Sequence, residues 1–329
     1  MSSTRPTCGS CLTFLGESVA MWDERNACLR SARAGHLECL RYAHEAGCSW
    51  DESTCCRASE NGHLECLRYA HESGCAWNSM VCCDASGSGR LECLRYAHEH
   101  GCPWNVATCH EASRGGHLEC LRYAHENGCP WDRMTCSLAA WTGRLHCLRY
   151  AHERGCPWDE TTTTWASEAG HLEALRYAHE QGCPWNEAVC YRASMNGHLD
   201  CLHYAHENGA PWDTWTCRLA SENGHLGCLR YALERGCPVP DFTLFTVDPA
   251  VVAYLHHRGV RLSVTNSAHL GDHIRGHVRR AWTLLRCTIS LLGAHHRACE
   301  RVYSPDGAGY REAETSFRDT VRKVDSSIP

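Results

Sequence analysis

Cysteine and histidine are the residues of this 329-residue chain that could do chemistry, because 27 cysteines and 24 histidines offer metal ligands and redox-active thiols. A structural zinc site needs four ligands that converge on one ion, commonly from closely spaced pairs. Most cysteines instead recur at equivalent places 27 residues apart, as Cys39, Cys66 and Cys93 do. If such units stack, equivalent places lie about one helix diameter apart, roughly 10 Å. We therefore expect no metal site and no cofactor.

Two further observations concern the thiols. Cys8 and Cys11 form a lone Cys-x-x-Cys, which is a weak signal, and a Cys/His-based metal-binding or redox-buffering protein stays as an alternative. Most other cysteines occupy places where other copies carry Ala, Val or Leu, which is typical of small core residues. The chain opens without an apolar run that resembles a signal peptide. We expect reduced thiols and an intracellular, cytoplasmic protein.

Catalysis is not expected, because serines, cysteines and carboxylates fall in repeated structural positions and no glycine-rich phosphate loop follows a strand pattern. The non-repeated histidines His273, His277, His295 and His296 are the exception to that repetition. A net charge of −6 gives no electrostatic reason to expect a nucleic-acid partner. No stretch is long and apolar enough to span a membrane. We expect no small-molecule substrate, and a protein partner rather than nucleic acid or membrane.

The elements that would position these residues follow from one spacing. The string Gly-His/Arg-Leu-x-x-Leu recurs every 27 residues without insertion or deletion. Such a strict period indicates a stacked repeat array. Its glycines are Gly35, Gly62, Gly89, Gly116, Gly143, Gly170, Gly197 and Gly224.

Each copy predicts two helices. In one copy Trp50 is followed by Asp51, a plausible N-cap, and the first helix ends at Gly62, which suits a left-handed turn. The next helix, 63–72, carries apolar residues at helical spacing, and Gly74 ends it. Neither helix can bury its apolar stripe alone, so hairpins must stack on their neighbours. We predict an all-α solenoid of stacked helical hairpins.

These motifs resemble the ankyrin repeat. The segment 62–70, Gly-His-Leu-Glu-Cys-Leu-Arg-Tyr-Ala, is similar to the second-helix signature Gly-His-x-x-Val-Val-x-Leu-Leu, and 53–59 falls where ankyrins carry Thr-Pro-Leu-His-x-Ala-Ala. Ankyrin repeats have ~33 residues, so these copies lack about six, which fall in the connection that projects a β-hairpin finger. Short arrays rich in Cys and Trp also resemble those of large DNA viruses of amoebae. The resemblance implies a viral, host-directed adaptor in the host cytoplasm, which binds a host protein.

The ends of the array depart from the period. The segment 251–259 fits the second helix of a ninth, divergent copy. Ile274, Val278, Trp282 and Leu285 begin a stripe at spacings of four and three, which predicts a basic amphipathic helix. That helix either docks on the end of the array or binds a separate partner or a membrane surface. The predicted organisation is 1–21 an N-terminal extension, 22–237 eight repeats, 238–260 the ninth repeat, 261–303 the basic helical segment and 304–329 a disordered tail.

The first helices vary between copies, whereas the second helices barely change. Positions three, seven and ten after each repeat tryptophan share one side of the first helix, here called the first-helix face. It is polar in the early copies and becomes apolar and aromatic in later ones. Trp, Tyr and Met are enriched in interface cores, so we predict a non-enzymatic interaction scaffold that binds a protein there, although some of these residues would alternatively pack against the chain's own extensions. The predicted partner-binding residues are Met134, Leu138, Trp141, Trp165, Tyr191, Trp215 and Leu219.

Overall fold

The computed structural model describes residues 26–239, 248, 250–251, 254–255 and 258. Contacts divide the chain into two units, Met1–Ser263 and Val264–Pro329, and all described residues belong to the first. The predicted N-terminal extension, basic helical segment and tail lie outside the described residues, as do the four non-repeated histidines. The domain boundaries therefore stay predictions.

The described residues form helices and connections, with no strand among them. The first helices of the hairpins are α2 (Ala27–Ala34), α4 (Glu52–Asn61), α6 (Ser79–Gly87), α8 (Val106–Gly115), α10 (Arg133–Trp141), α12 (Glu160–Glu168), α14 (Ala188–Asn196) and α16 (Thr214–Glu222). The second helices are α3 (Leu37–Glu45), α5 (Leu64–Glu72), α7 (Leu91–Glu99), α9 (Leu118–Glu126), α11 (Leu145–Glu153), α13 (Leu172–Glu180), α15 (Leu199–Glu207) and α17 (Leu226–Glu234).

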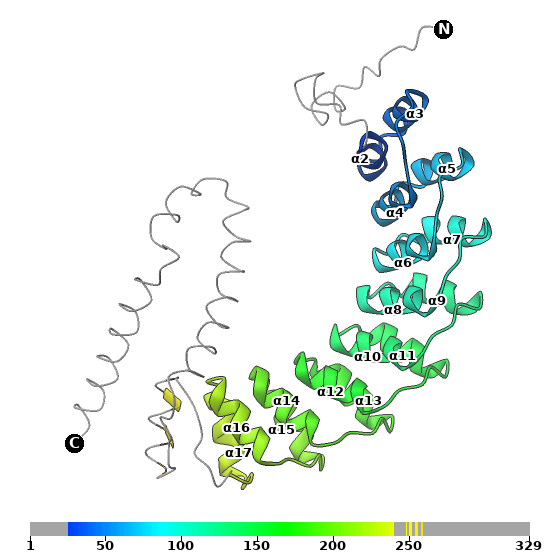
Figure 1. The fold of residues 1–329 in the computed structure, drawn as a ribbon. Coiled ribbons are helices and arrows are strands. Elements are labelled where there is room, and N and C mark those ends of the chain that lie inside the picture. Colours follow the sequence, from blue (N-terminus) through cyan, green and yellow to red (C-terminus); the bar gives the residue numbers. More distant parts are fainter. Residues whose placement is uncertain (1–25, 240–247, 249, 252–253, 256–257, 259–329) are drawn as a thin grey trace, which may run out of the picture. The chain divides into compact units, whose positions relative to one another are not determined.

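The hairpins stack so that first helices form one row and second helices another (Figure 1). Neighbouring first helices pack closely along the row, whereas neighbouring second helices touch far less. A stack that is tighter along one row bends toward that row, so the first helices follow the inner side of the curve. The predicted all-α solenoid of helical hairpins is confirmed.

The caps explain where the first helices begin and end. Asp51 accepts a hydrogen bond from the Ser53 amide at 3.0 Å, and the Asp or Asn at the equivalent place caps the following helix in the same way. Before α14, Asn186 accepts a hydrogen bond from the Ala188 amide at 2.9 Å, and Ala188 is the first residue of that helix. Gly62 has φ 79°, the left-handed conformation that ends a helix with little strain in glycine. The capping residues predicted from sequence therefore do cap.

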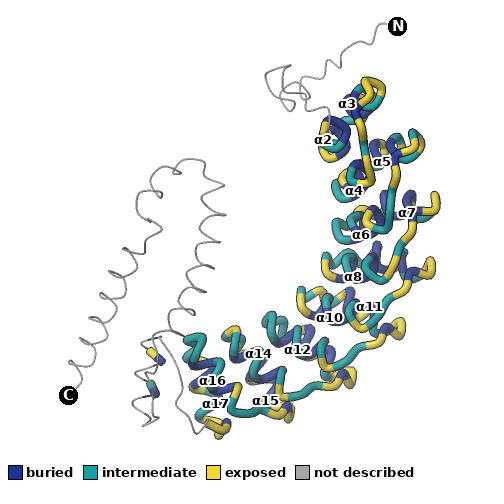
Figure 2. The backbone as a smooth tube through the Cα atoms, in the orientation of Figure 1, coloured by how far each residue is buried: buried dark blue, intermediate teal, exposed yellow. Residues whose placement is uncertain are grey.

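The core lies between the two rows (Figure 2). In the second repeat Leu67, Ala70 and Cys66 of α5 are buried, and so is Ala58 of α4. The 23 cysteines of the described residues are all buried, and none of these 23 forms a disulfide. They behave as the small apolar residues that their repeat positions predict.

The His or Arg of the Gly-His/Arg motif also makes a contact between repeats. His63 of one repeat lies over Gly35 of the previous one, and its Nε2 is 3.1 Å from the Arg33 carbonyl at the end of α2. Where arginine replaces histidine, Arg90 packs over Gly62, and its Nε donates to the Glu60 carbonyl at 3.3 Å. Each side chain thus caps carbonyls that the previous first helix leaves unpaired. Glycine is needed for this close approach as well as for its positive φ.

Beyond α17 the structure describes a few further residues. Asp248 accepts hydrogen bonds from the amides of Ala250 and Val251 at 2.9 and 3.1 Å. Val251 and Leu255 are fully buried, four residues apart. The Arg258 guanidinium lies 3.6 Å from Glu234 at the end of α17. The ninth copy, 238–260, stays a prediction. Within the described residues, no helix is long and apolar enough to cross a membrane.

Candidate functional site

The predicted binding residues lie on the first helices of four successive repeats. Trp141 of α10 and Trp215 of α16 are large apolar side chains with 45% and 48% of their surface exposed. The remaining five are half-buried: Met134 and Leu138 in α10, Trp165 in α12, Tyr191 in α14 and Leu219 in α16. Met80 of α6, which the sequence analysis left out of the binding set, is 51% exposed in the polar part of the same face. Met80 is three residues after Trp77, a position of the first-helix face, so the sequence could have identified it as a candidate binding residue.

The structure brings two of these side chains together. The indole rings of Trp141 and Trp165 have centroids 6.0 Å apart and are tilted by 59°. Trp215 has a different neighbour, since the Arg218 guanidinium lies over its ring at 4.7 Å and donates to Glu222 at 2.7 Å. Arg192 lies 5.7 Å from the ring centroid of Tyr191. Among the described residues, no ring contact joins Trp215 or Tyr191 to the tryptophan pair.

The early part of the first-helix face is charged and largely self-paired. Arg57 forms an ion pair with Glu60 within α4, and Arg114 forms one with Glu111 within α8. Asp84 lies in α6, the first helix between α4 and α8. Burial raises the pKa of the Asp84 carboxyl, and the charge of Glu60 raises this pKa further. Asp84 accepts from the Cys56 thiol. This part of the face therefore presents little unpaired charge to a partner.

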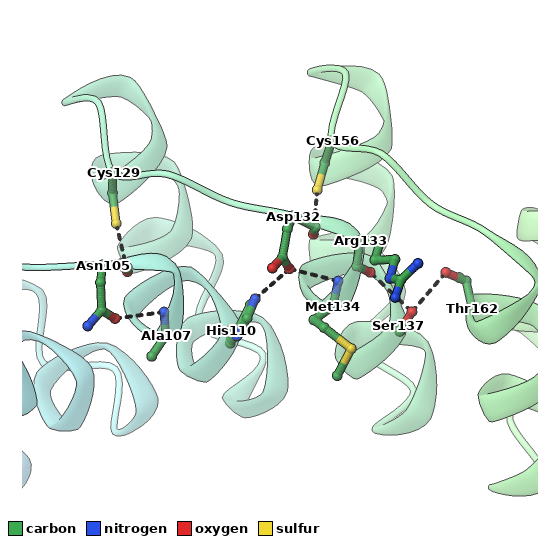
Figure 3. A network of polar contacts seen from close by, with 10 residues as sticks. All are labelled: Asn105, Ala107, His110, Cys129, Asp132, Arg133, Met134, Ser137, Cys156 and Thr162. Atoms are coloured by element: carbon green, nitrogen blue, oxygen red, sulfur yellow. Dashed lines mark hydrogen bonds and ion pairs between the residues drawn. The ribbon is translucent and has the colours of Figure 1, made fainter.

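A polar network fixes the helices on either side of α10 (Figure 3). Asp132 caps α10 at the Met134 amide, 2.9 Å away, and contacts His110 Nε2 of α8 at 2.7 Å. Arg133 lies 3.0 Å from Asp159, the cap of α12, and the Ser137 and Thr162 hydroxyls lie 3.1 Å apart. The first helices that carry the tryptophan pair are thereby held in fixed register. The sequence analysis selected Tyr191 at this repeat position but not His110, because the contact of His110 is with Asp132 of the next repeat.

The repeat histidines and tryptophans form a separate aromatic ladder on the connections between hairpins. His44 stacks on Trp50 with ring centroids 3.8 Å apart, and its Nδ1 lies 3.0 Å from the Tyr69 hydroxyl of the next repeat. The stack recurs in all seven copies of this connection and the hydrogen bond in six of them. The repeat tryptophans thus pack between repeats, and the histidines are held by stacking and hydrogen bonds.

The cysteines pair in a way that a comparison of equivalent positions does not predict. Cys55 of α4 and Cys75, after α5, lie in hydrogen-bond contact, and the Cys75 thiol donates to the Asp51 carbonyl at 3.1 Å. Four further pairs repeat this arrangement: Cys82 with Cys102, Cys109 with Cys129, Cys136 with Cys156, and Cys217 with Cys237. The hydrogen bond to Cys75, followed by burial, raises the pKa of Cys55, so this thiol stays neutral. Among the described residues, no three Cys, His, Asp or Glu side chains converge as metal ligands would.

An array of eight hairpins with a constant interior and a variable row of first helices defines a solenoid repeat protein, a class in which function resides on an extended surface. Residues 190–233 match the family described as "Ankyrin repeats (many copies)", so this part of the chain carries ankyrin repeats. Ankyrin repeats are a general protein-interaction fold and typically non-enzymatic.

The ankyrin repeat domain of human ASB11 has a similar structure. The match has a TM-score of 0.43 at 20% sequence identity, and covers 49% of this chain and 85% of that domain. No curated protein matches this chain in sequence.

Proposed function

We propose that this protein is a non-enzymatic scaffold that binds a protein partner on the concave, first-helix face, centred on the seven predicted residues from Met134 to Leu219. The observation that carries the proposal is the pair Trp141 and Trp165 of adjacent repeats, an exposed indole in contact with a half-buried one. Exposed aromatic side chains on a rigid support are typical binding hot spots.

The stack itself does not require these tryptophans. Position ten after the repeat tryptophan holds Trp141 in one copy but Glu60 and Arg114 in others, and all of these copies form the same hairpin. The exposed apolar surface of Trp141 is therefore not needed to form the hairpin, and a binding partner that covers it would explain its presence. The resemblance to arrays of large DNA viruses of amoebae favours a host protein as this partner, recruited by an adaptor in the host cytoplasm.

The test is affinity capture from amoebal cell lysate followed by mass spectrometry. The intact chain is compared with a triple variant, Leu138→Ser, Trp165→Ser and Leu219→Ser. A matched control carries Glu99→Ser, Glu126→Ser and Glu153→Ser, at the exposed ends of three second helices. Circular dichroism must show equal helicity for all three.

We expect a partner that the intact chain and the control retain and the triple variant loses at least ~10-fold, since several hot-spot side chains each contribute 1–2 kcal/mol or more. Capture of the same proteins by all three chains would move the binding site off the first-helix face. Loss in the control alone would place it on the second helices.

A further inference from the structure

The tryptophan pair has a geometry that suggests what it binds. Trp141 and Trp165 form a corner of two indole rings tilted by 59°. Glu168 lies three residues after Trp165 on the same side of α12, and it holds the same repeat position as Trp141. We infer that this corner receives an arginine side chain of the protein partner, with the guanidinium against the indole rings and facing the Glu168 carboxylate. The inference rests on the proposed function, because it names the partner chemistry at that face.

Helix α16 already contains such an arrangement. In α16 the Arg218 guanidinium lies 4.7 Å from the ring centroid of Trp215, and its Nε donates to Glu222 at 2.7 Å. Helix α16 thus holds a tryptophan, an arginine and a carboxylate in contact with one another. At the corner between α10 and α12 the tryptophans and the carboxylate are present. Among the described residues, no arginine or lysine lies over either ring.

The charges around the corner favour a cation. Glu168 contacts Arg192 of the next repeat through Oε1 alone, at 3.4 Å, so the carboxylate keeps capacity for a second donor. The arginines of neighbouring repeats are already engaged, Arg114 with Glu111 and Arg133 with Asp159. The chain as a whole carries a net charge of −6, which favours a basic partner.

Arginine fits better than lysine because its planar guanidinium stacks on aromatic faces and presents a fork of donors to a carboxylate. An ammonium group is a compact, strongly hydrated charge that stacks less well. An apolar side chain would use the rings but would not use the remaining acceptor capacity of the Glu168 carboxylate.

The test uses the full-length protein labelled with 5-fluorotryptophan and followed by fluorine NMR. The signals of Trp141 and Trp165 are assigned with Trp141→Phe and Trp165→Phe. The probes are four blocked peptides, acetyl-Gly-X-Gly-amide, in which X is arginine, its neutral isostere citrulline, lysine or leucine. Each is titrated to about 50 mM, where a Kd near 10 mM would still be visible.

We expect the arginine peptide to shift the Trp141 and Trp165 signals saturably and to leave Trp215 unmoved, because Arg218 already covers that ring. Citrulline should bind at least several-fold more weakly, and Glu168→Gln should weaken arginine binding to a similar degree at unchanged helicity. No saturable shift with arginine, or an equal shift with citrulline, lysine or leucine, would overturn the inference.

Failure here can be told apart from failure of the proposed function. If the captured partner is lost with the triple variant but retained by Glu168→Gln, the first-helix face binds a protein without an arginine in this corner. The proposed function would then stand and the inference would not.

Discussion

At the scale of single residues, burial decides what the cysteines can do. Burial raises the pKa of Cys66 to about 11 and that of Cys147 to about 12, and the thiolate is the reactive form. We predict that the 23 cysteines of the described residues react with Ellman's reagent at about pH 8 only as fast as the array opens. All 27 thiols should react at once in denaturant. Fast modification of more than four thiols at unchanged circular dichroism would show that the core thiols are accessible.

Histidines give the array a pH dependence. Burial lowers the pKa of His71, His117, His125, His171 and His206 below the ordinary 6.5. Below that value the unfolded chain binds protons that the folded chain does not, so the free energy of unfolding falls as pH falls. We predict a lower Tm at about pH 5.5 than at about pH 7.5.

The chain itself offers the variant that isolates one of these histidines. Arg90 and Arg144 hold the same repeat position as His171, so His171→Arg should keep the contact with the previous repeat and remove one titrating group. The loss of Tm on acidification should be smaller in this variant. Burial raises the pKa of Asp84, which acts in the opposite direction, but that contribution is common to both chains. An equal loss in both would exclude His171 as a source of the pH dependence.

At the scale of helices, the sequence predicts local features better than contacts between repeats. The caps at Asp51 and Gly62 depend on residues within a few positions, so their spacing reveals them. The contact of His63 with Gly35 and that of His110 with Asp132 depend on how neighbouring hairpins are offset, which no spacing within one copy determines. For the same reason the sequence predicted which helices carry the tryptophans, but not that Trp141 and Trp165 meet.

Gly89 and Gly101 lie in the same repeat. Together they allow two requirements for glycine to be tested separately, a positive φ and the close approach of a side chain from the next repeat. Gly101 has φ +82°, and a methyl group added to it would have nothing within 4 Å, whereas a methyl on Gly89, at φ +70°, would lie 2.5 Å from the His117 ring. We predict that Gly101→Ala lowers the free energy of unfolding by about 1–2 kcal/mol, from left-handed strain alone. Gly89→Ala should cost about 1–3 kcal/mol more, because His117 must also move. Urea denaturation followed by circular dichroism measures both. An equal loss of unfolding free energy in both variants would show that the His117 side chain moves aside without a measurable energetic cost.

At the scale of the whole array, each hairpin packs chiefly on its two neighbours, so stability is a sum of hairpin and interface contributions. Removing one complete period should therefore leave a continuous stack. Deletion of residues 78–104 joins Trp77 to Asn105, which keeps the tryptophan and its following N-cap. The deletion brings Gly62 under His117, a pairing of the kind that Gly35 and His63 make in the intact chain.

We predict that this deletion variant stays helical and unfolds cooperatively, with a urea m-value lower by roughly an eighth, because m scales with the surface exposed on unfolding. Deletion of residues 78–90, which leaves α7 without its first helix, should instead destabilise the array and expose apolar surface to the dye ANS. The first variant should also retain the captured partner, because Trp141, Trp165 and Glu168 keep their own neighbours. A chain that folds but no longer binds would extend the binding surface to Met80, the exposed side chain that the deletion removes.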